Sequence, residues 1–198
     1  MDRNHISCCC SHHGKDQTRI TQRWLFSLGF VLVFTLLIKP FMADQLIKRA
    51  DAYYSSGFYD DAIRQYKKVI LLNKTDSDAW ISLGDSFKAK REVGKAIAAF
   101  REAVKAAPED RAANFKLGMA LAMSKDKDYD SAVVYFEKVR SLGAEPKEQL
   151  LVGGFSYYRS SLNMLAICLE KLQEFEKATK VWEEFERACR GDTSACEK

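Results

Sequence analysis

The sequence is poor in glycine and almost free of proline. Of its 198 residues, 10 are Gly and 3 are Pro. Strand-rich proteins with many tight turns depend on these two residue types, so their scarcity argues against a loop-rich all-β protein. The composition is otherwise that of an ordinary globular protein, with 47% hydrophobic and 29% charged residues. The length suffices for one good-sized domain and a tail.

Histidine is missing from most of the chain, because all three His residues lie before residue 14. The rest therefore has no imidazole base, and none of the motifs G-x-x-x-x-G-K-[ST], G-x-S-x-G or H-E-x-x-H occurs. Acidic pairs such as Glu183 and Glu184 are interpreted as solvated surface groups. We predict that the protein is not an enzyme and has no catalytic residue, cofactor or small-molecule substrate. The alternative is a cryptic enzyme or a non-catalytic subunit of an enzyme complex.

Cysteine is too sparse for a disulfide scaffold, with six residues of which three are adjacent, Cys8 to Cys10. No C-x-x-C pair with a second pair of ligands is present, so we predict no metal site. The segment CCCSHHGK has two interpretations, a soft-metal site or a disordered tail whose thiols are acylated beside a membrane, and we favour the tail. Cys189 and Cys196 are either free or bonded in a small loop after the last helix.

A strong excess of positive charge is also absent, since the formal net charge is +4 and most of it lies before residue 44. Acidic and basic residues alternate along the remaining chain as on a solvated surface. Nucleic-acid binders concentrate Lys and Arg on one face. We therefore predict no nucleic-acid partner.

One long apolar stretch stands out, WLFSLGFVLVFTLLI between Arg23 and Lys39. With PFMA after Lys39 it reaches about 20 residues, enough to span a bilayer. Phe41 makes a poor signal-peptidase site, so we predict an uncleaved transmembrane anchor over 24–43, after a disordered basic tail over 1–23. A cleaved signal peptide or a buried core helix are the alternatives.

The orientation of this anchor follows from the flanking charges. Four Lys or Arg residues precede the segment and three follow it closely, so the positive-inside rule places the N-terminus in the cytoplasm by a narrow margin. The body of the protein is then expected on the periplasmic or lumenal side as part of a single-pass membrane protein.

Beyond the apolar stretch, small and aromatic residues recur at a constant interval. Ala50, Gly84 and Gly118 follow this interval, and so do the pairs Ala62 with Ala96 and Tyr66 with Phe100. The best unit has its signature residues in this order: Trp80, Leu83, Gly84, Phe87, Ala96, Phe100 and Pro108. The interval of about 34 residues and the pattern W-x2-L-G-x2-Y…A-x3-F…P are those of the tetratricopeptide repeat (TPR), which the sequence resembles.

The resemblance implies an all-α fold, a right-handed superhelix of antiparallel helix hairpins. We expect about four repeats at 43–76, 77–110, 111–146 and 159–192, in a domain over 44–191 with a C-terminal tail over 192–198. The third repeat reaches Ala132 and Phe136 two residues late, which predicts a lengthened turn at SKDKDYD. The segment around Gly153 and Gly154 is an insertion or an extension of the last repeat. Small residues are expected to let the paired helices approach, with aromatic residues filling the gap to the neighbouring repeat.

The resemblance also implies a concave groove, lined by the first helix of each hairpin, that holds a peptide or partner helix. The positions that the pattern places on this groove are Ile47, Asp51, Tyr54, Ile81, Asp85, Lys88, Phe115, Met119, Met123, Ile167 and Glu170. The family's chaperone-binding branch uses Lys, Arg and Asn to clamp a C-terminal carboxylate. Here the corresponding positions include Ile47, Asp51, Ser82 and Ala112, so carboxylate capture is disfavoured despite Lys116. The expected function is a membrane-anchored scaffold that recruits a protein partner, and the alternative is a self-assembling homo-oligomer.

Overall fold

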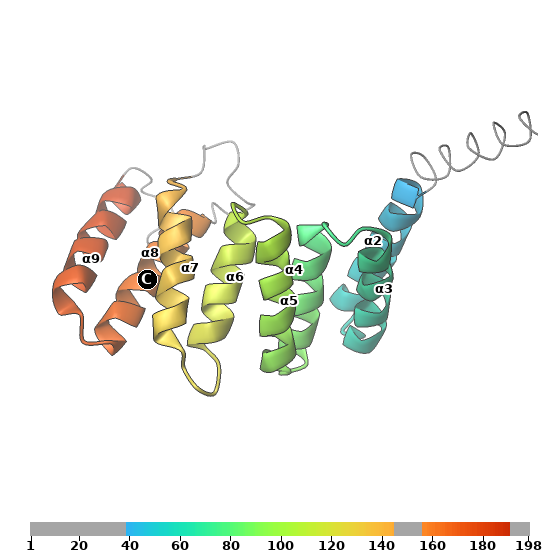
Figure 1. Ribbon diagram of the computed structural model, residues 1–198, viewed down its shortest axis with the longest axis horizontal. Coiled ribbons are helices and arrows are strands. Elements are labelled where there is room, and N and C mark those ends of the chain that lie inside the picture. The colour runs from blue at the N-terminus through green and yellow to red at the C-terminus, as the bar shows by residue number, and fades with distance from the viewer. Residues whose placement is uncertain (1–38, 145–155, 191–198) are drawn as a thin grey trace, which may run out of the picture. The chain divides into compact units, whose positions relative to one another are not determined.

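The computed structural model describes residues 39–144 and 156–190, and these residues form helices and no strand. The helices pair into four hairpins (Figure 1): α2 (Lys39–Ser55) with α3 (Tyr59–Leu72), α4 (Ser77–Ala89) with α5 (Val93–Ala106), α6 (Arg111–Ala122) with α7 (Tyr129–Ser141), and α8 (Tyr157–Lys171) with α9 (Phe175–Arg190). Successive hairpins pack through α3 on α4, α5 on α6 and α7 on α8. The predicted all-α array of about four helix hairpins is therefore confirmed for the described part of the chain.

Side-chain caps mark where several of these helices begin. Asp76 accepts a hydrogen bond from the backbone N–H of Ala79 (3.0 Å), and Asp110, at the equivalent position of the next repeat, accepts from Ala112 (2.8 Å). Asp128 and Ser156 cap α7 and α8 in the same way. A carboxylate at this position satisfies an orphan backbone donor and interacts favourably with the helix dipole. The capping residues thus set the start of α4, α6, α7 and α8.

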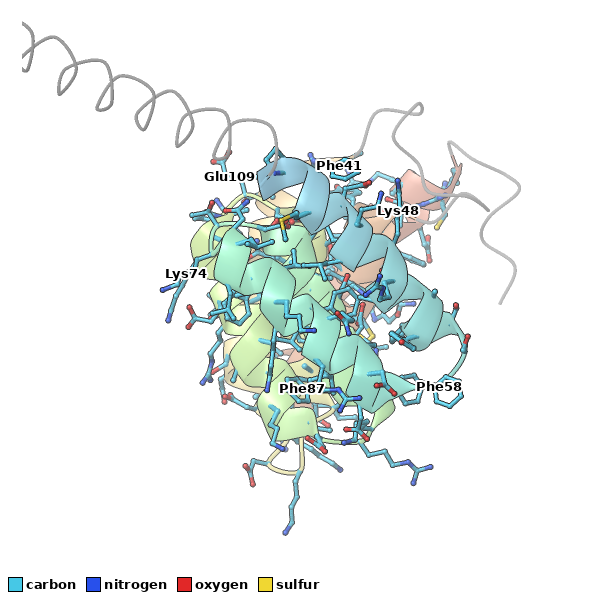
Figure 2. All side chains as sticks on the ribbon, turned by 90° about the vertical axis from the view of Figure 1, so that its right-hand side faces the viewer. Phe41, Lys48, Phe58, Lys74, Phe87 and Glu109 are labelled. Carbon is cyan, nitrogen blue, oxygen red and sulfur yellow. The ribbon has the colours of Figure 1, made fainter. Side chains whose placement is uncertain are left out.

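The tight turns inside the hairpins use a left-handed residue. Gly57, Arg91 and Gln173 have φ angles of 81°, 62° and 64°, and each lies in a three-residue connection between paired helices. Glycine adopts this conformation without steric cost, whereas Arg and Gln adopt it with strain. Figure 2, which faces the first hairpin, shows the ring of Phe58 next to such a turn, and 61% of this residue is exposed.

The regular spacing of glycine and aromatic residues has a direct packing explanation. A Cβ atom on Gly84 would lie 2.4 Å from the ring of Phe100, and one on Gly118 would lie 2.9 Å from the ring of Phe136. Both rings are fully buried. Each of these rings thus packs against the glycine of its own hairpin. That the aromatic residues also fill the gap to the neighbouring repeat agrees with Tyr66, which lines a pocket with Ser82 and Asp85 of the next hairpin, and stays a prediction for Phe100 and Phe136.

The irregular third repeat has the lengthened turn that the spacing predicts. The connection between α6 and α7 covers residues 123–128, whereas the connections within the other hairpins have three residues. Lys127 has a φ angle of 48° there. Because Phe136 still reaches Gly118, the turn absorbs the extra residues and the packing of the helices is preserved.

The last hairpin differs at its aromatic position. Trp182 is only half buried, and its indole N–H donates to Glu170 (2.8 Å) while its ring meets Phe185 edge-on at 5.7 Å. Among the described residues no further hairpin packs on α9. An aromatic residue with a polar group suits this position because one side of it remains in water.

A polar network joins the last two hairpins. Glu184 of α9 accepts hydrogen bonds from Arg140 of α7 (2.5 Å) and from the hydroxyl of Tyr158 of α8 (2.6 Å). Burial opposes ionisation of Glu184, but these two donors outweigh it and lower the pKa of the carboxyl. Three helices from two repeats are thus connected through one carboxylate.

Several sequence expectations fall outside the described residues. They concern the tail with Cys8 to Cys10, the segment Trp24 to Ile38 of the expected anchor, the glycines at 153 and 154, and the tail over 192–198. The last residues of the expected anchor form the first turn of α2. None of the helices that the structure describes combines the length and the apolar character that a membrane span requires.

Candidate functional site

A pocket of about 220 Å³ opens among the first helices that the structure describes. Its walls are formed by Asp51 and Tyr54 of α2, Tyr66 of α3, and Ser82 and Asp85 of α4. Three of these, Asp51, Tyr54 and Asp85, belong to the expected groove. The volume is below the roughly 300 to 1,000 Å³ of small-molecule sites, so the pocket is suited to a single side chain of a polypeptide.

The repeat itself places the two carboxylates of the pocket. Asp51 and Asp85 are one repeat length apart and occupy equivalent positions in successive repeats. On their own helices each has a second lining residue three positions away, Tyr54 after Asp51 and Ser82 before Asp85. Residues three apart lie on the same helix face. The helical period and the repeat length therefore together place these four side chains, two from α2 and two from α4, around the pocket.

Asp51 is hydrogen-bonded by a neutral group. The hydroxyl of Tyr66, a residue that is only 3% exposed, donates to Oδ1 of Asp51 at 2.5 Å. Burial, together with this bond to a carboxylate, raises the pKa of Tyr66 well above its usual range. The phenol therefore stays protonated and positions Asp51 without neutralising its charge.

Asp85 has a cationic partner, in contrast to Asp51. Nζ of Lys116 of α6 lies 2.7 Å from Oδ2 of Asp85, and both side chains are about one quarter exposed. The pairing joins the first helices of two neighbouring hairpins. It also engages Lys116, which agrees with the expectation that this lysine does not provide a clamp for a C-terminal carboxylate.

Tyr54 lies at the exposed edge of the pocket. This residue is 37% exposed, and its ring meets the ring of Tyr59 edge-on with centroids 5.6 Å apart. Partial burial and the nearby carboxylate of Asp85 raise the pKa of Tyr54. The phenol is thus a neutral aromatic wall beside two acids.

The other expected groove residues are distributed between core and surface. Ile81 is buried in a small cluster with Ala103 and Ala113, and with 7% of the residue exposed it presents little surface to a partner. Four further apolar positions are half buried: Ile47, Phe115, Met119 and Ile167. The exposed positions are Lys88, Met123 and Glu170. The described pocket contains none of these eight residues.

Phe115 has a clear packing role. Its ring lies 5.9 Å from the ring of Phe136 and 5.6 Å from the ring of Tyr157, so it bridges α6 to α7 and α8. Removing this ring would disturb the contact between two hairpins. A loss of partner binding in a Phe115 variant is therefore no measure of a direct contact with the partner.

Sequence reasoning misses three residues at this site. From the repeat pattern, Tyr66 is expected only to pack between helices. Ser82 is considered only as a residue that does not fit a carboxylate clamp, and Lys116 is interpreted as a lysine without neighbouring basic residues. The repeat spacing that relates Asp51 to Asp85 is a signal that is present in the sequence. The Lys116 pair carries no such signal, because it depends on how closely α6 approaches α4.

Comparisons with solved structures support the same architecture. A crystal structure of MamA is 20% identical and superposes with a TM-score of 0.65, covering 92% of this chain and 98% of that chain. The type III secretion translocator chaperone SycD of Yersinia enterocolitica is 22% identical (TM-score 0.56, covering 67% and 93%). The first TPR of Spaghetti (RPAP3), bound to an HSP90 peptide, is 18% identical (TM-score 0.54, covering 66% and 93%). At these identities the likeness establishes the fold alone.

Sequence comparison identifies the family directly. No curated protein sequence matches the chain. The sequence model described as "Tetratricopeptide repeat" matches residues 47–107 and 81–145, which together span half of the 198 residues. This fold is typically non-catalytic. Eight described helices in four hairpins and the regular packing pattern agree with that match, and the chain belongs to the tetratricopeptide repeat family.

Proposed function

We propose that this protein is a scaffold that binds a partner polypeptide on the surface formed by the first helices of its repeats. The observation that carries the proposal is the pocket lined by Asp51, Tyr54, Tyr66, Ser82 and Asp85. It is lined by two successive first helices, α2 and α4, and by Tyr66 of α3, and it presents polar and aromatic side chains, a combination typical of recognition surfaces. Solenoids of this kind use such surfaces for binding.

The structural neighbours support this type of activity. SycD is described as a translocator chaperone and the RPAP3 repeat is bound to an HSP90 peptide. Both are proteins of this fold that act on polypeptides. For the present chain the proposal requires only that a polypeptide contacts the pocket and the adjacent exposed residues of α2, α4 and α6.

We further propose that the segment 24–43 anchors the scaffold in a membrane, with the repeats on the non-cytoplasmic side. The support comes from the sequence, an unbroken apolar run flanked by positive charges on both sides. Cys189 in the last turn of α9 is disulfide-bonded, and such bonds persist mainly in oxidising compartments. A scaffold in this place would organise its partner at the membrane surface.

Site-specific photocrosslinking tests the binding surface. A photoreactive phenylalanine analogue replaces Tyr54, which is 37% exposed beside the pocket, or Val134 of α7, which is 64% exposed and lies away from it. In cells that express the full chain, irradiation should link a partner polypeptide to the Tyr54 position and not to the Val134 position. Crosslinks that form only at Val134 would place the binding surface on the second helices and contradict the proposal.

A further inference from the structure

The charge of Asp51 is the unusual feature of the pocket. Its carboxylate accepts one hydrogen bond, from the neutral Tyr66 hydroxyl, and no Lys or Arg of residues 39–144 and 156–190 forms an ion pair with it. Asp85, at the equivalent position of the next repeat, is paired with Lys116. The two carboxylates and one lysine leave one negative charge that the described part of the pocket does not balance.

The two carboxylates line a cavity of about 220 Å³ that is open to solvent, and Asp51 itself is an exposed residue. A cation that enters this cavity is attracted to the carboxylate at short range, although water and salt screen part of the attraction. A phosphate or a C-terminal carboxylate would meet the charge of Asp51 and find Lys116 already engaged by Asp85. The electrostatics of the pocket therefore select against an anionic ligand.

The residues that line the pocket favour an arginine side chain over a lysine side chain. Tyr54 is an exposed residue beside the two acids, and Ser82 also lines the cavity. A guanidinium group stacks on an aromatic face while its planar set of donors bonds to a carboxylate, whereas an ammonium group has no plane to stack. The Tyr66 hydroxyl donates one hydrogen bond to Asp51, and because a carboxylate can accept several, it has acceptor capacity left for such donors.

From this combination of cavity, aromatic wall and unbalanced carboxylate we infer that the pocket binds an arginine side chain of the partner polypeptide. The guanidinium pairs with Asp51 and stacks on Tyr54, while Asp85 and Ser82 accept from its remaining N–H groups. The inference rests on the proposed function, since it names the chemistry by which the scaffold recognises its partner. It restricts the partners to chains that expose an arginine on the contacting segment.

The test uses the full chain in detergent micelles with ¹³C-labelled tyrosine rings. Nα-acetyl-arginine amide is titrated in, and Nα-acetyl-citrulline amide, a neutral compound of nearly the same shape, is the matched ligand. We expect the resonance of Tyr54, assigned through Tyr54→Phe, to shift in a saturable manner with the arginine compound and not with the citrulline compound. Raising the salt concentration should weaken the arginine effect, because salt screens a partly exposed ion pair.

Two variants separate the charge from the rest of the pocket. Asp51→Asn keeps an acceptor for Tyr66 but removes the charge, and it should weaken arginine binding by up to about fivefold, as expected for an ion pair at an exposed residue. Glu102→Gln removes an acid of α5 that pairs with Lys105 outside the pocket and should bind as the wild type does. Tyr54→Ala, at an exposed position, should weaken binding without unfolding the chain, so the test does not depend on Asp51→Asn alone.

Several results would overturn the inference. These are equal shifts with arginine and citrulline, an absence of shifts at Tyr54, or undiminished binding by a folded Asp51→Asn protein. If they occur while the photocrosslink through position 54 persists, the arginine specificity is wrong and the binding surface stands. If the crosslink is also absent, the proposed function itself fails.

Discussion

Gly84 is the residue at which the repeat pattern has its strictest steric requirement. The ring of Phe100 occupies the space where a side chain would begin, at 2.4 to 2.8 Å from the position of a Cβ atom. Gly84→Ala should therefore lower the free energy of unfolding by about 1–3 kcal/mol, the usual cost of overpacking a core. Urea denaturation followed by circular dichroism measures the change.

A second glycine provides the control. Gly94 lies in the first turn of α5, and a Cβ atom there would meet nothing within 4 Å. Gly94→Ala should raise the free energy of unfolding by up to about 1 kcal/mol because alanine is the better helix former. A Gly84→Ala protein as stable as Gly94→Ala would show that the ring of Phe100 moves aside freely.

Substitutions at the left-handed turn residues Gly57 and Arg91, which occupy equivalent positions, should change the stability of the protein in different directions. Gly57 and Arg91 occupy the same place in successive hairpins, and both have positive φ angles. Gly57→Ala should destabilise the protein by about 1 kcal/mol, since an L side chain is strained in this conformation. Arg91→Gly should be neutral or stabilising, because relief of that strain offsets the greater entropy of an unfolded glycine. Thermal unfolding of both variants tests the pair, and a destabilised Arg91→Gly protein would contradict the prediction.

At the scale of elements, the junction between α7, α8 and α9 should depend on pH through Tyr158. Burial, followed by the hydrogen bond to Glu184, raises the pKa of Tyr158 from 10.0 to about 12. The folded protein thus holds this proton more tightly than the unfolded chain does. The resulting stability is fully present below pH 10 and is lost as the pH rises towards about 12.

Melting temperatures between about pH 9 and 12 measure this effect, and Tyr158→Phe is the matched variant because it removes only the hydroxyl. The variant should be less stable at neutral pH, by roughly 1 kcal/mol for a lost hydrogen bond, and its melting temperature should fall less steeply at alkaline pH. Identical slopes for the two proteins would mean that the Glu184 network makes no net contribution to the junction.

At the scale of the whole molecule, the first question is whether the apolar segment remains part of the mature chain. We expect it to stay attached, because Phe41 occupies a position where cleavage requires a small residue. Mass spectrometry of the mature protein should therefore find residues before Asp44, and the protein should remain in the membrane fraction after an alkaline wash. A mature chain that begins near Asp44 would identify the segment as a signal peptide.

The disulfide of Cys189 gives a second prediction for the whole chain. Cys196 lies outside the described residues, and a bond between Cys189 and Cys196 stays a prediction that would stabilise the end of α9 by roughly 2 kcal/mol. Cys168 is fully buried in the core as a free thiol. Alkylation under denaturing, non-reducing conditions should leave Cys189 and Cys196 unlabelled, and six reactive thiols would exclude the bond.

Much of the fold was predictable because its information is local and periodic. The constant repeat interval, the small residues that precede aromatic ones and the late Ala132 follow from the order of residues along the chain. They predict helices, hairpins and the long turn between α6 and α7. Helical period and repeat length together also place Asp51 and Asp85 at equivalent positions, so one element of the candidate site was within reach of sequence reasoning.

The tertiary structure decided what depends on distances between helices. Only the packing of α6 beside α4 pairs Lys116 with Asp85 and leaves Asp51 without such a partner in the described structure. Packing also buries Ile81, engages Phe115 between two aromatic rings and makes Tyr66 a wall of the pocket. The sequence by itself determined the repeat and the positions of its side chains along each helix. A side chain becomes part of the core, an ion-pair partner or an exposed binding residue according to which other helices lie within a few ångströms of it. Those helices are distant along the chain, and a repeat pattern in the sequence does not specify the distances between them.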